Sequence, residues 1–275
     1  MLLRKDMENK TIEIVYVATN GYCNYAEGFF STLKYFMPGV KKIVTVLTNG
    51  MDEYEGYCGG DVIKTNIIKM FDLFYPCINL HKPYFIEQLP KANTDYIFYF
   101  DADTIFKEVP DYNWEEMIND LESRKVLISK HPMYAAKDTF SLRNITKRDW
   151  IANFYTDNMT ERDVNRSAYI PEGEYTYVIS SFFAARRDVM HELDKYLIKL
   201  TRSDLTRSTR YHIPQFMDEN YFNALVYDYE NGRLNQPYGF SVKQYSELRN
   251  GDSDFYDSIF IYQKNFNDEF KTNRR

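Results

Sequence analysis

The segment Thr94–Pro110, TDYIFYFDADTIFKEVP, places two aspartates, Asp101 and Asp103, directly after a run of apolar and aromatic residues. Such a run predicts a β-strand that is buried on both faces, as in a parallel sheet. A parallel strand that ends in acids brings them to the carboxyl edge of its sheet, where open α/β sheets bind ligands. The segment therefore predicts an α/β fold with an acidic site at the end of this strand.

The spacing of the two acids indicates a metal site. Residues i and i+2 of an extended segment point the same way, so Asp101 and Asp103 are expected to direct two carboxylates at one point. Two hard oxygen donors suit Mn²⁺ or Mg²⁺, with water and a diphosphate completing the shell. The alternative is a turn in which the acids bond local backbone N–H groups. A second triplet, Asp252-Ser253-Asp254, has no such strand before it.

The segments on either side alternate between strand-like and helix-like patterns. Strands are expected at Thr11–Thr19, Lys42–Thr48, Asp95–Asp103, Lys125–Lys130 and Tyr175–Ala185, and helices at Asn24–Phe36, Lys82–Leu89, Trp114–Arg124, Asp188–Leu200 and Met217–Gly232. This alternation predicts a mainly parallel sheet with helices on both faces. We find no Pro/Gly-rich boundary, so one domain is expected over residues 1–275, although Met133–Arg166 has no clear element.

Composition narrows the class of protein. The 275 residues are 44% hydrophobic, enough for one sizeable core, and the net charge of −6 without a basic stripe argues against a nucleic-acid partner. The three cysteines show neither metal-ligand spacing nor a disulfide framework, which favours a reducing compartment. No apolar run approaches the roughly 18 residues of a membrane span, and the start is not a signal peptide. These features predict a cytoplasmic protein without an integral membrane segment.

Four stretches together resemble a known family. They are IVYVATNGYCNYAEGFFSTLKYFM, YIFYFDADTIF, SAYIPEGEYTYVISSFFAA and FMDENYFNALVYD, which lie in family order over Ile14–Asp228. In these stretches the chain resembles the family 6 glycosyltransferases, which include the blood-group A and B transferases, the α-1,3-galactosyltransferases and bacterial relatives. The resemblance implies a GT-A fold with a Rossmann-like sheet. It also implies retaining transfer of galactose or N-acetylgalactosamine from a UDP-sugar donor to a glycan acceptor, forming an α-1,3 linkage.

The resemblance also implies roles for single residues. Asp101 and Asp103 match the metal-binding D-x-D of the family, so the expected cofactor is Mn²⁺ or Mg²⁺. Glu219 falls on the catalytic glutamate. Tyr22 falls where a tyrosine after the first strand stacks on uracil, and Thr19 beside it is assigned to the same nucleotide site. The alternative for Tyr22 is a core tyrosine at the entry to a helix. From the residue type alone, an acid favoured by the first turn of a helix is the better interpretation of Glu219.

The remaining candidate residues lie in the donor and acceptor regions. Asp218 matches the acid that helps hold donor or acceptor hydroxyls, and Lys82 stands nearest to the donor-reaching arginine of the family. Phe216 and Met217 replace a Trp-His pair that contacts the acceptor. Ile179, Ser180 and Ser181 replace a triplet of small residues that selects the donor. Because Ser181 is bulkier than Gly or Ala, it should crowd an N-acetyl group, which favours UDP-galactose.

Some assignments and alternatives stay open at this stage. Lys264 and Arg274 are candidates for closing over the diphosphate, although a solvated tail also fits them. A second enzymatic hypothesis is a glycosyltransferase of another GT-A family, such as one that uses UDP-glucose. A third hypothesis, from a different class, is a non-catalytic carbohydrate-binding protein, against which the acids Asp101, Asp103 and Glu219 argue. The sequence does not specify the oligomeric state.

Overall fold

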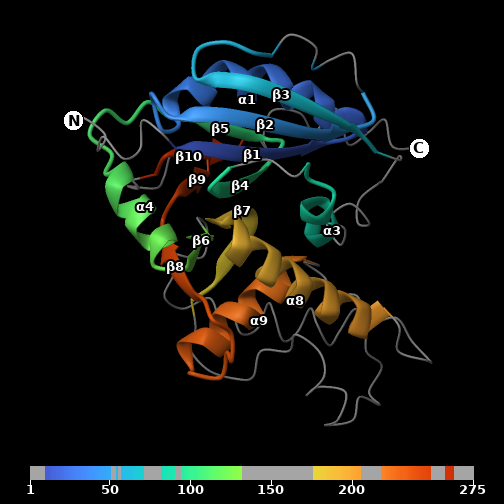
Figure 1. Ribbon diagram of the computed structural model, residues 1–275, viewed down its shortest axis with the longest axis vertical. Helices are drawn as coiled ribbons and strands as arrows, with labels where there is room; N and C mark the ends of the chain where they lie inside the picture. The colour runs from blue at the N-terminus through green and yellow to red at the C-terminus, as the bar shows by residue number, and fades with distance from the viewer. Residues whose placement is uncertain are drawn as a thin grey trace.

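The computed structural model describes residues 10–50, 54, 57–70, 82–90, 94–131, 176–205, 218–248 and 258–262. These residues form two β-sheets, and helices cover both faces of the larger one (Figure 1). The larger sheet contains β1 (Thr11–Ala18), β2 (Lys41–Thr48), β3 (Val62–Lys69), β4 (Tyr96–Asp101), β6 (Lys125–Lys130), β7 (Val178–Arg186) and β8 (Gly239–Lys243). The smaller sheet contains β5 (Thr104–Phe106), β9 (Ser246–Leu248) and β10 (Phe260–Tyr262).

The larger sheet is mostly parallel. Its strand order is β3-β2-β1-β4-β7-β6-β8, and β3, β2, β1 and β4 run in the same direction. Strands β6 and β8 are also parallel, whereas β7 is antiparallel to both of its neighbours, β4 and β6. The prediction of a mixed α/β protein with a mainly parallel sheet is therefore confirmed. This topology is compatible with a Rossmann-like fold.

Each face of the sheet has its own hydrophobic core. Helices α1 (Ala26–Thr32) and α4 (Trp114–Glu122) pack on one face, and α3 (Lys82–Glu87), α8 (Arg187–Leu205) and α9 (Asp218–Glu230) pack on the other. Alternate residues of β1 divide between the two cores, because successive side chains of a strand point to opposite faces. This double cover explains why the central strands are apolar almost throughout.

The helix predicted over Asn24–Phe36 is divided into shorter pieces. The 3₁₀ helix η1 (Asn20–Tyr25) precedes α1, and the 3₁₀ helix η2 (Leu33–Tyr35) follows it. Thr32, at the end of α1, donates its hydroxyl to helix carbonyls and accepts a hydrogen bond of 3.0 Å from the backbone N–H of Phe106. Such side-chain bonds compete with the regular helical pattern and tie this end of α1 to β5 instead.

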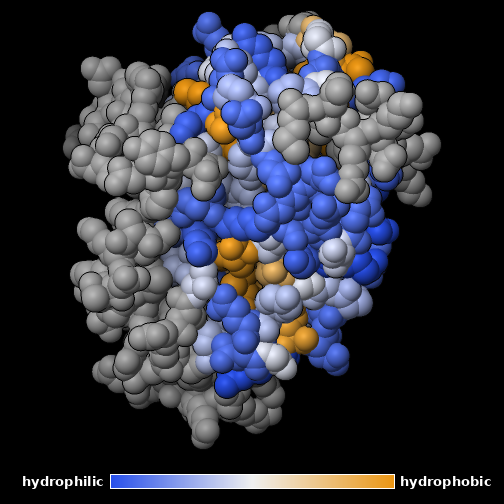
Figure 2. Space-filling model, turned by 90° about the vertical axis from the view of Figure 1, so that its left-hand side faces the viewer, coloured by the Kyte–Doolittle hydropathy of each residue, from blue (hydrophilic) through white to orange (hydrophobic). Residues whose placement is uncertain are grey.

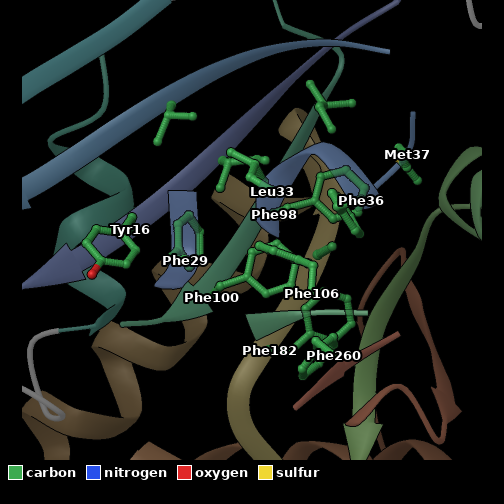
Figure 3. Packing of buried hydrophobic residues seen from close by; sticks show 14 of the residues in the cluster. Tyr16, Phe29, Leu33, Phe36, Met37, Phe98, Phe100, Phe106, Phe182 and Phe260 are labelled. Atoms are coloured by element: carbon green, nitrogen blue, oxygen red, sulfur yellow. The ribbon is translucent and has the colours of Figure 1, made fainter. Parts of the chain in front are cut away.

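The smaller sheet joins the larger one through phenylalanine side chains. Figure 3 shows Phe100 of β4, Phe106 of β5, Phe182 of β7 and Phe260 of β10 gathered in one cluster. The ring centroid of Phe100 lies 5.0 Å from the centroids of both Phe106 and Phe182, and 5.6 Å from that of Phe260. Each buried Phe contributes roughly 1.5–3 kcal/mol relative to an exposed one. This packing holds the segment after β4 against the end of the sheet.

Among the residues that Figure 2 colours by hydropathy, small apolar patches lie between hydrophilic residues. None of the helices in the described part of the chain is both long enough and apolar enough to cross a membrane.

Candidate functional site

Strand β4 brings Asp101 to the carboxyl edge of the parallel strands. All the residues of β4 before Asp101 are buried, whereas the Asp101 side chain is 24% exposed. Tyr99 lies on the same side of the strand and donates its hydroxyl to Asp101 Oδ1 at 3.0 Å. Burial raises the pKa of Tyr99 above its usual value, so the hydroxyl stays protonated and available as a donor. Asp101 is thus an oriented carboxylate that a ligand can reach.

Asp103 is close to Asp101 in sequence but has different surroundings. Strand β4 ends at Asp101, and Ala102 and Asp103 form a turn that leads into β5. The expectation that Asp101 and Asp103 point the same way along one extended segment therefore does not apply, because Asp103 is not part of the strand. Asp103 is buried, and its charge helps to raise the pKa of Tyr16, for which burial is the largest cause. Both acids nevertheless lie at the same end of β4.

Lys82, the first residue of α3, bridges two acids of the site. Its Nζ atom lies 3.0 Å from Asp101 Oδ1 and 2.8 Å from Asp218 Oδ2, and it donates to the backbone carbonyl of Ser180 at 3.4 Å. It also lies 5.3 Å from the ring centroid of Tyr99. Burial lowers the pKa of Lys82, but the two carboxylates outweigh it and raise the pKa above its usual value. Lys82 is therefore a permanent cation between two acids.

Asp218 and Glu219 form the start of α9. Acids are favoured in the first turn of a helix because the helix dipole is positive there. Asp218 is 2% exposed, and burial raises its pKa, while Lys82 and the Ser180 hydroxyl act in the opposite direction. The Glu219 carboxylate accepts a hydrogen bond of 2.5 Å from the Tyr177 hydroxyl. Of the described contacts of these adjacent acids, that of Asp218 is with a cation and that of Glu219 is with a tyrosine hydroxyl.

The candidate donor-selecting residues lie in an irregular part of β7. Pairing with β6 jumps from Ile128 opposite Phe183 to Ser129 opposite Ile179, so Ser180, Ser181 and Phe182 have no counterpart on β6. Bulges of this kind redirect side chains and are common beside active sites. Ile179, Ser180 and Ser181 are all buried, and Ser180 contacts Lys82 and Asp218 as described above. This irregularity brings part of the triplet into the acidic site.

Thr19 and Tyr22 follow β1 at the same edge of the sheet. Thr19 is buried, and its carbonyl accepts the backbone N–H of Tyr22 at 3.1 Å, which fixes the start of η1. Tyr22 is half-buried and packs beside Tyr25, with 6.1 Å between ring centroids. Asn20 and Asn49 form reciprocal hydrogen bonds of 2.9 and 3.0 Å, which link the ends of β1 and β2. No described contact joins Thr19 or Tyr22 to Lys82, Asp101 or Asp218.

Four candidate residues cannot be placed in this site. Phe216, Met217, Lys264 and Arg274 lie outside the described residues.

The donor chemistry at the end of β4 fits a divalent cation that is shared with a substrate. Asp101 and Asp103 supply carboxylate oxygens, the ligands that Mn²⁺ and Mg²⁺ prefer. The described residues contain no group of three or more His, Cys, Asp or Glu that could hold a metal ion. Among the described contacts of this site, the cation Lys82 is paired with Asp101 and Asp218. An anionic diphosphate would need a cation to approach these acids.

Three residues of the site were missed by sequence reasoning. Tyr99 orients Asp101, Tyr177 contacts Glu219, and Asn223 connects α9 to β7. Tyr99 could have been found, because it lies two residues before Asp101 in a predicted strand and so shares its face. Asn223 lies four residues after Glu219, one turn along the predicted helix. Tyr177 carried no local signal, since its contact with Glu219 depends on how β7 and α9 pack.

Comparison of the chain with known protein families and with curated protein sequences finds no match.

Proposed function

We propose that this chain is a retaining glycosyltransferase with a GT-A fold. It moves galactose or N-acetylgalactosamine from a UDP-sugar to a glycan hydroxyl and forms an α-1,3 linkage. The observation that carries the proposal is the Lys82 bridge, which joins Asp101 at the end of β4 to Asp218 at the start of α9. This bridge assembles an acidic site at the edge of a mainly parallel sheet, where such sheets bind ligands. The motif resemblance supports the choice of reaction.

Asp101 and Asp103 would hold Mn²⁺ or Mg²⁺ at this edge. When bound, the ion would act as a Lewis acid that stabilises the negative charge on the departing UDP. Tyr99 and Lys82 both contact the Asp101 carboxylate through its Oδ1 atom. Asp218, held by Lys82, is the acid that would bind sugar hydroxyls.

Glu219 would act on the sugar. When the bond between the anomeric carbon and the phosphate oxygen breaks, its electron pair stays with UDP and positive charge develops on the carbon. The Glu219 carboxylate stabilises that charge, as a nucleophile or as an electrostatic partner. The acceptor hydroxyl then bonds to the anomeric carbon and passes its proton to the departing diphosphate, which carries the electron pair of the broken bond. Because Glu219 acts on developing charge, it matters more for turnover than for binding of UDP.

A panel of nucleotide sugars tests the proposal through their slow hydrolysis in the presence of Mn²⁺. We expect turnover of UDP-galactose and UDP-N-acetylgalactosamine, with a modest preference for galactose because Ser181 lies buried in the bulge of β7. We expect excess EDTA to abolish turnover. Glu219→Gln should lower kcat by a factor on the order of 10²–10³, and Asp103→Asn should remove most activity.

The matched control is Asp95→Asn, which makes the same change as Asp103→Asn at a 43% exposed side chain just before β4. It should leave turnover unchanged. Activity in excess EDTA would contradict the metal assignment, and normal turnover by Glu219→Gln would contradict the role of Glu219. If no UDP-sugar is hydrolysed or transferred, the glycosyltransferase proposal itself is wrong.

A further inference from the structure

Asn223 connects α9 to β7 with both ends of its side-chain amide. Its Oδ1 accepts the backbone N–H of Val178 at 2.8 Å, and its Nδ2 donates to the Val178 carbonyl at 2.9 Å. The same Nδ2 donates to the backbone carbonyl of Glu219 at 2.8 Å, one turn earlier in the helix. Asn223 is fully buried, so water does not compete for these bonds. The backbones of Val178 and Glu219 are therefore held in a fixed relation.

Because Asn223 holds the backbones of Val178 and Glu219 together, Tyr177 lies within contact of the Glu219 side chain. It directly precedes Val178, is 3% exposed, and donates its hydroxyl to Glu219 Oε1 at 2.5 Å. An O–H···O⁻ bond of this length is typical of a charge-assisted hydrogen bond, which is stronger than one between neutral groups. The carboxylate of Glu219 is thereby held in one orientation by a donor that is itself fixed.

The Tyr177 ring is supported independently of its hydroxyl. The backbone N–H of His131 donates to the Tyr177 carbonyl at 3.0 Å, and the His131 ring meets the tyrosine ring edge-on with 5.5 Å between centroids. Removing only the hydroxyl therefore leaves the position of the ring unchanged. A Tyr177→Phe variant removes the bond to Glu219 and keeps the ring.

We propose that Tyr177 is a positioning residue for the reaction, which it serves by holding the Glu219 carboxylate toward the donor sugar. This inference rests on the proposed function, in which Glu219 stabilises the anomeric carbon. A carboxylate that is oriented before the substrate binds does not have to be ordered during the reaction. Tyr177 should therefore act on kcat through Glu219 and have little effect on donor binding.

The experiment is a double-mutant cycle measured by UDP-galactose hydrolysis in the presence of Mn²⁺. Tyr177→Phe should lower kcat by roughly tenfold, as expected for the loss of one hydrogen bond to a charged group, and change the donor KM by less than about twofold. In a Glu219→Gln background the same change should have no further effect on kcat. The control is Tyr238→Phe, at a buried tyrosine whose hydroxyl has no hydrogen-bond partner in the described structure; it should leave kcat unchanged.

The cycle separates failure of this inference from failure of the proposed function. If Glu219→Gln is slow but Tyr177→Phe has normal kcat, or lowers kcat equally in both backgrounds, Tyr177 does not act through Glu219. An effect confined to KM would also overturn the inference. Normal turnover by Glu219→Gln, or no turnover of any UDP-sugar by the unmodified protein, would instead remove the function on which the inference rests, and the role of Tyr177 with it.

Discussion

Asp218 and Asp194 are two buried acids on the neighbouring helices α9 and α8, and their surroundings differ. Each is 2% exposed. Asp218, on α9, has the Lys82 ammonium 2.8 Å from its Oδ2 atom, whereas Asp194, on α8, has no cation within ion-pair distance among the described contacts. Lys82 and Asp194 even line the same small apolar hollow, which has no room for a water molecule.

The two acids avoid the cost of a buried, unpaired negative charge in different ways. Burial raises the pKa of Asp194 from 3.8 to about 8, with Glu87 adding to the effect and Lys195 opposing it. Asp194 is therefore protonated at neutral pH and behaves as a neutral packing residue. Asp218 keeps a cation within ion-pair distance instead, at the edge of the sheet where Asp101 also lies. Of these two acids, the one in the proposed site is paired with a cation, and the one outside it carries a proton.

The largest expected effect comes from removing the shared cation. Lys82→Met keeps most of the stem but leaves Asp101 and Asp218 without their partner, so the free energy of unfolding should fall by about 3–5 kcal/mol. Urea denaturation at pH 7 measures this change. The double variant Lys82→Met/Asp218→Asn removes the stranded charge and should recover much of the loss. A loss below about 1 kcal/mol in the single variant would show that the bridge is not needed for folding.

A smaller effect, which depends on pH, is expected at Asp194. The pKa of Asp194 is raised from 3.8 to about 8 on folding, so its contribution to stability is complete below pH 3.8 and is lost as pH rises toward 8. Asp194→Asn cannot ionise, so its stability relative to the unmodified protein should increase from pH 5 to pH 8. Thermal denaturation across this range tests the prediction. Parallel pH curves for the two proteins would mean that Asp194 is not buried as a neutral acid.

The smallest loss of stability is expected at an exposed ion pair. It serves as the comparison for the buried ion pairs of Lys82. Lys10 Nζ lies 3.4 Å from Asp95 Oδ1, and the two side chains are 32% and 43% exposed. Lys10→Gln should reduce the free energy of unfolding by less than about 1 kcal/mol, because solvent screens such pairs. The same urea experiment applies. If Lys10→Gln cost as much as Lys82→Met, burial would not be the cause of the difference between them.

The sequence predicted those parts of the fold in which local pattern and burial agree. Strands β1, β2 and β4 are buried over most of their length, and their β-branched and aromatic residues indicated them directly. Strand β3 was missed because it lies at the edge of the sheet and is half-exposed, with polar residues between its apolar ones. The three-residue strands of the smaller sheet are too short to produce a periodic pattern.

The site was predictable as a set of residues, but not as a set of contacts. Asp101, Lys82 and Asp218 were each chosen from the sequence, yet nothing in the sequence indicated that one lysine joins the two acids. That contact depends on α3 and α9 packing on the same face of the sheet. The turn at Ala102–Asp103 was also missed, because the apolar residues after Asp103 continue the strand pattern although the backbone leaves the sheet.

The pairing of β5 with β10 has a consequence for how the chain is synthesised. Phe106 pairs with Phe260, and the backbone N–H of Lys107 donates to the Ile259 carbonyl, so the segment after Asp103 is completed by residues more than half the chain away. Translation proceeds from the amino terminus, and domains form contacts as their residues emerge from the ribosome. Strands β1 to β4 therefore emerge well before the partner of β5. The acidic turn is among the last parts of the site to gain its neighbours on a nascent chain.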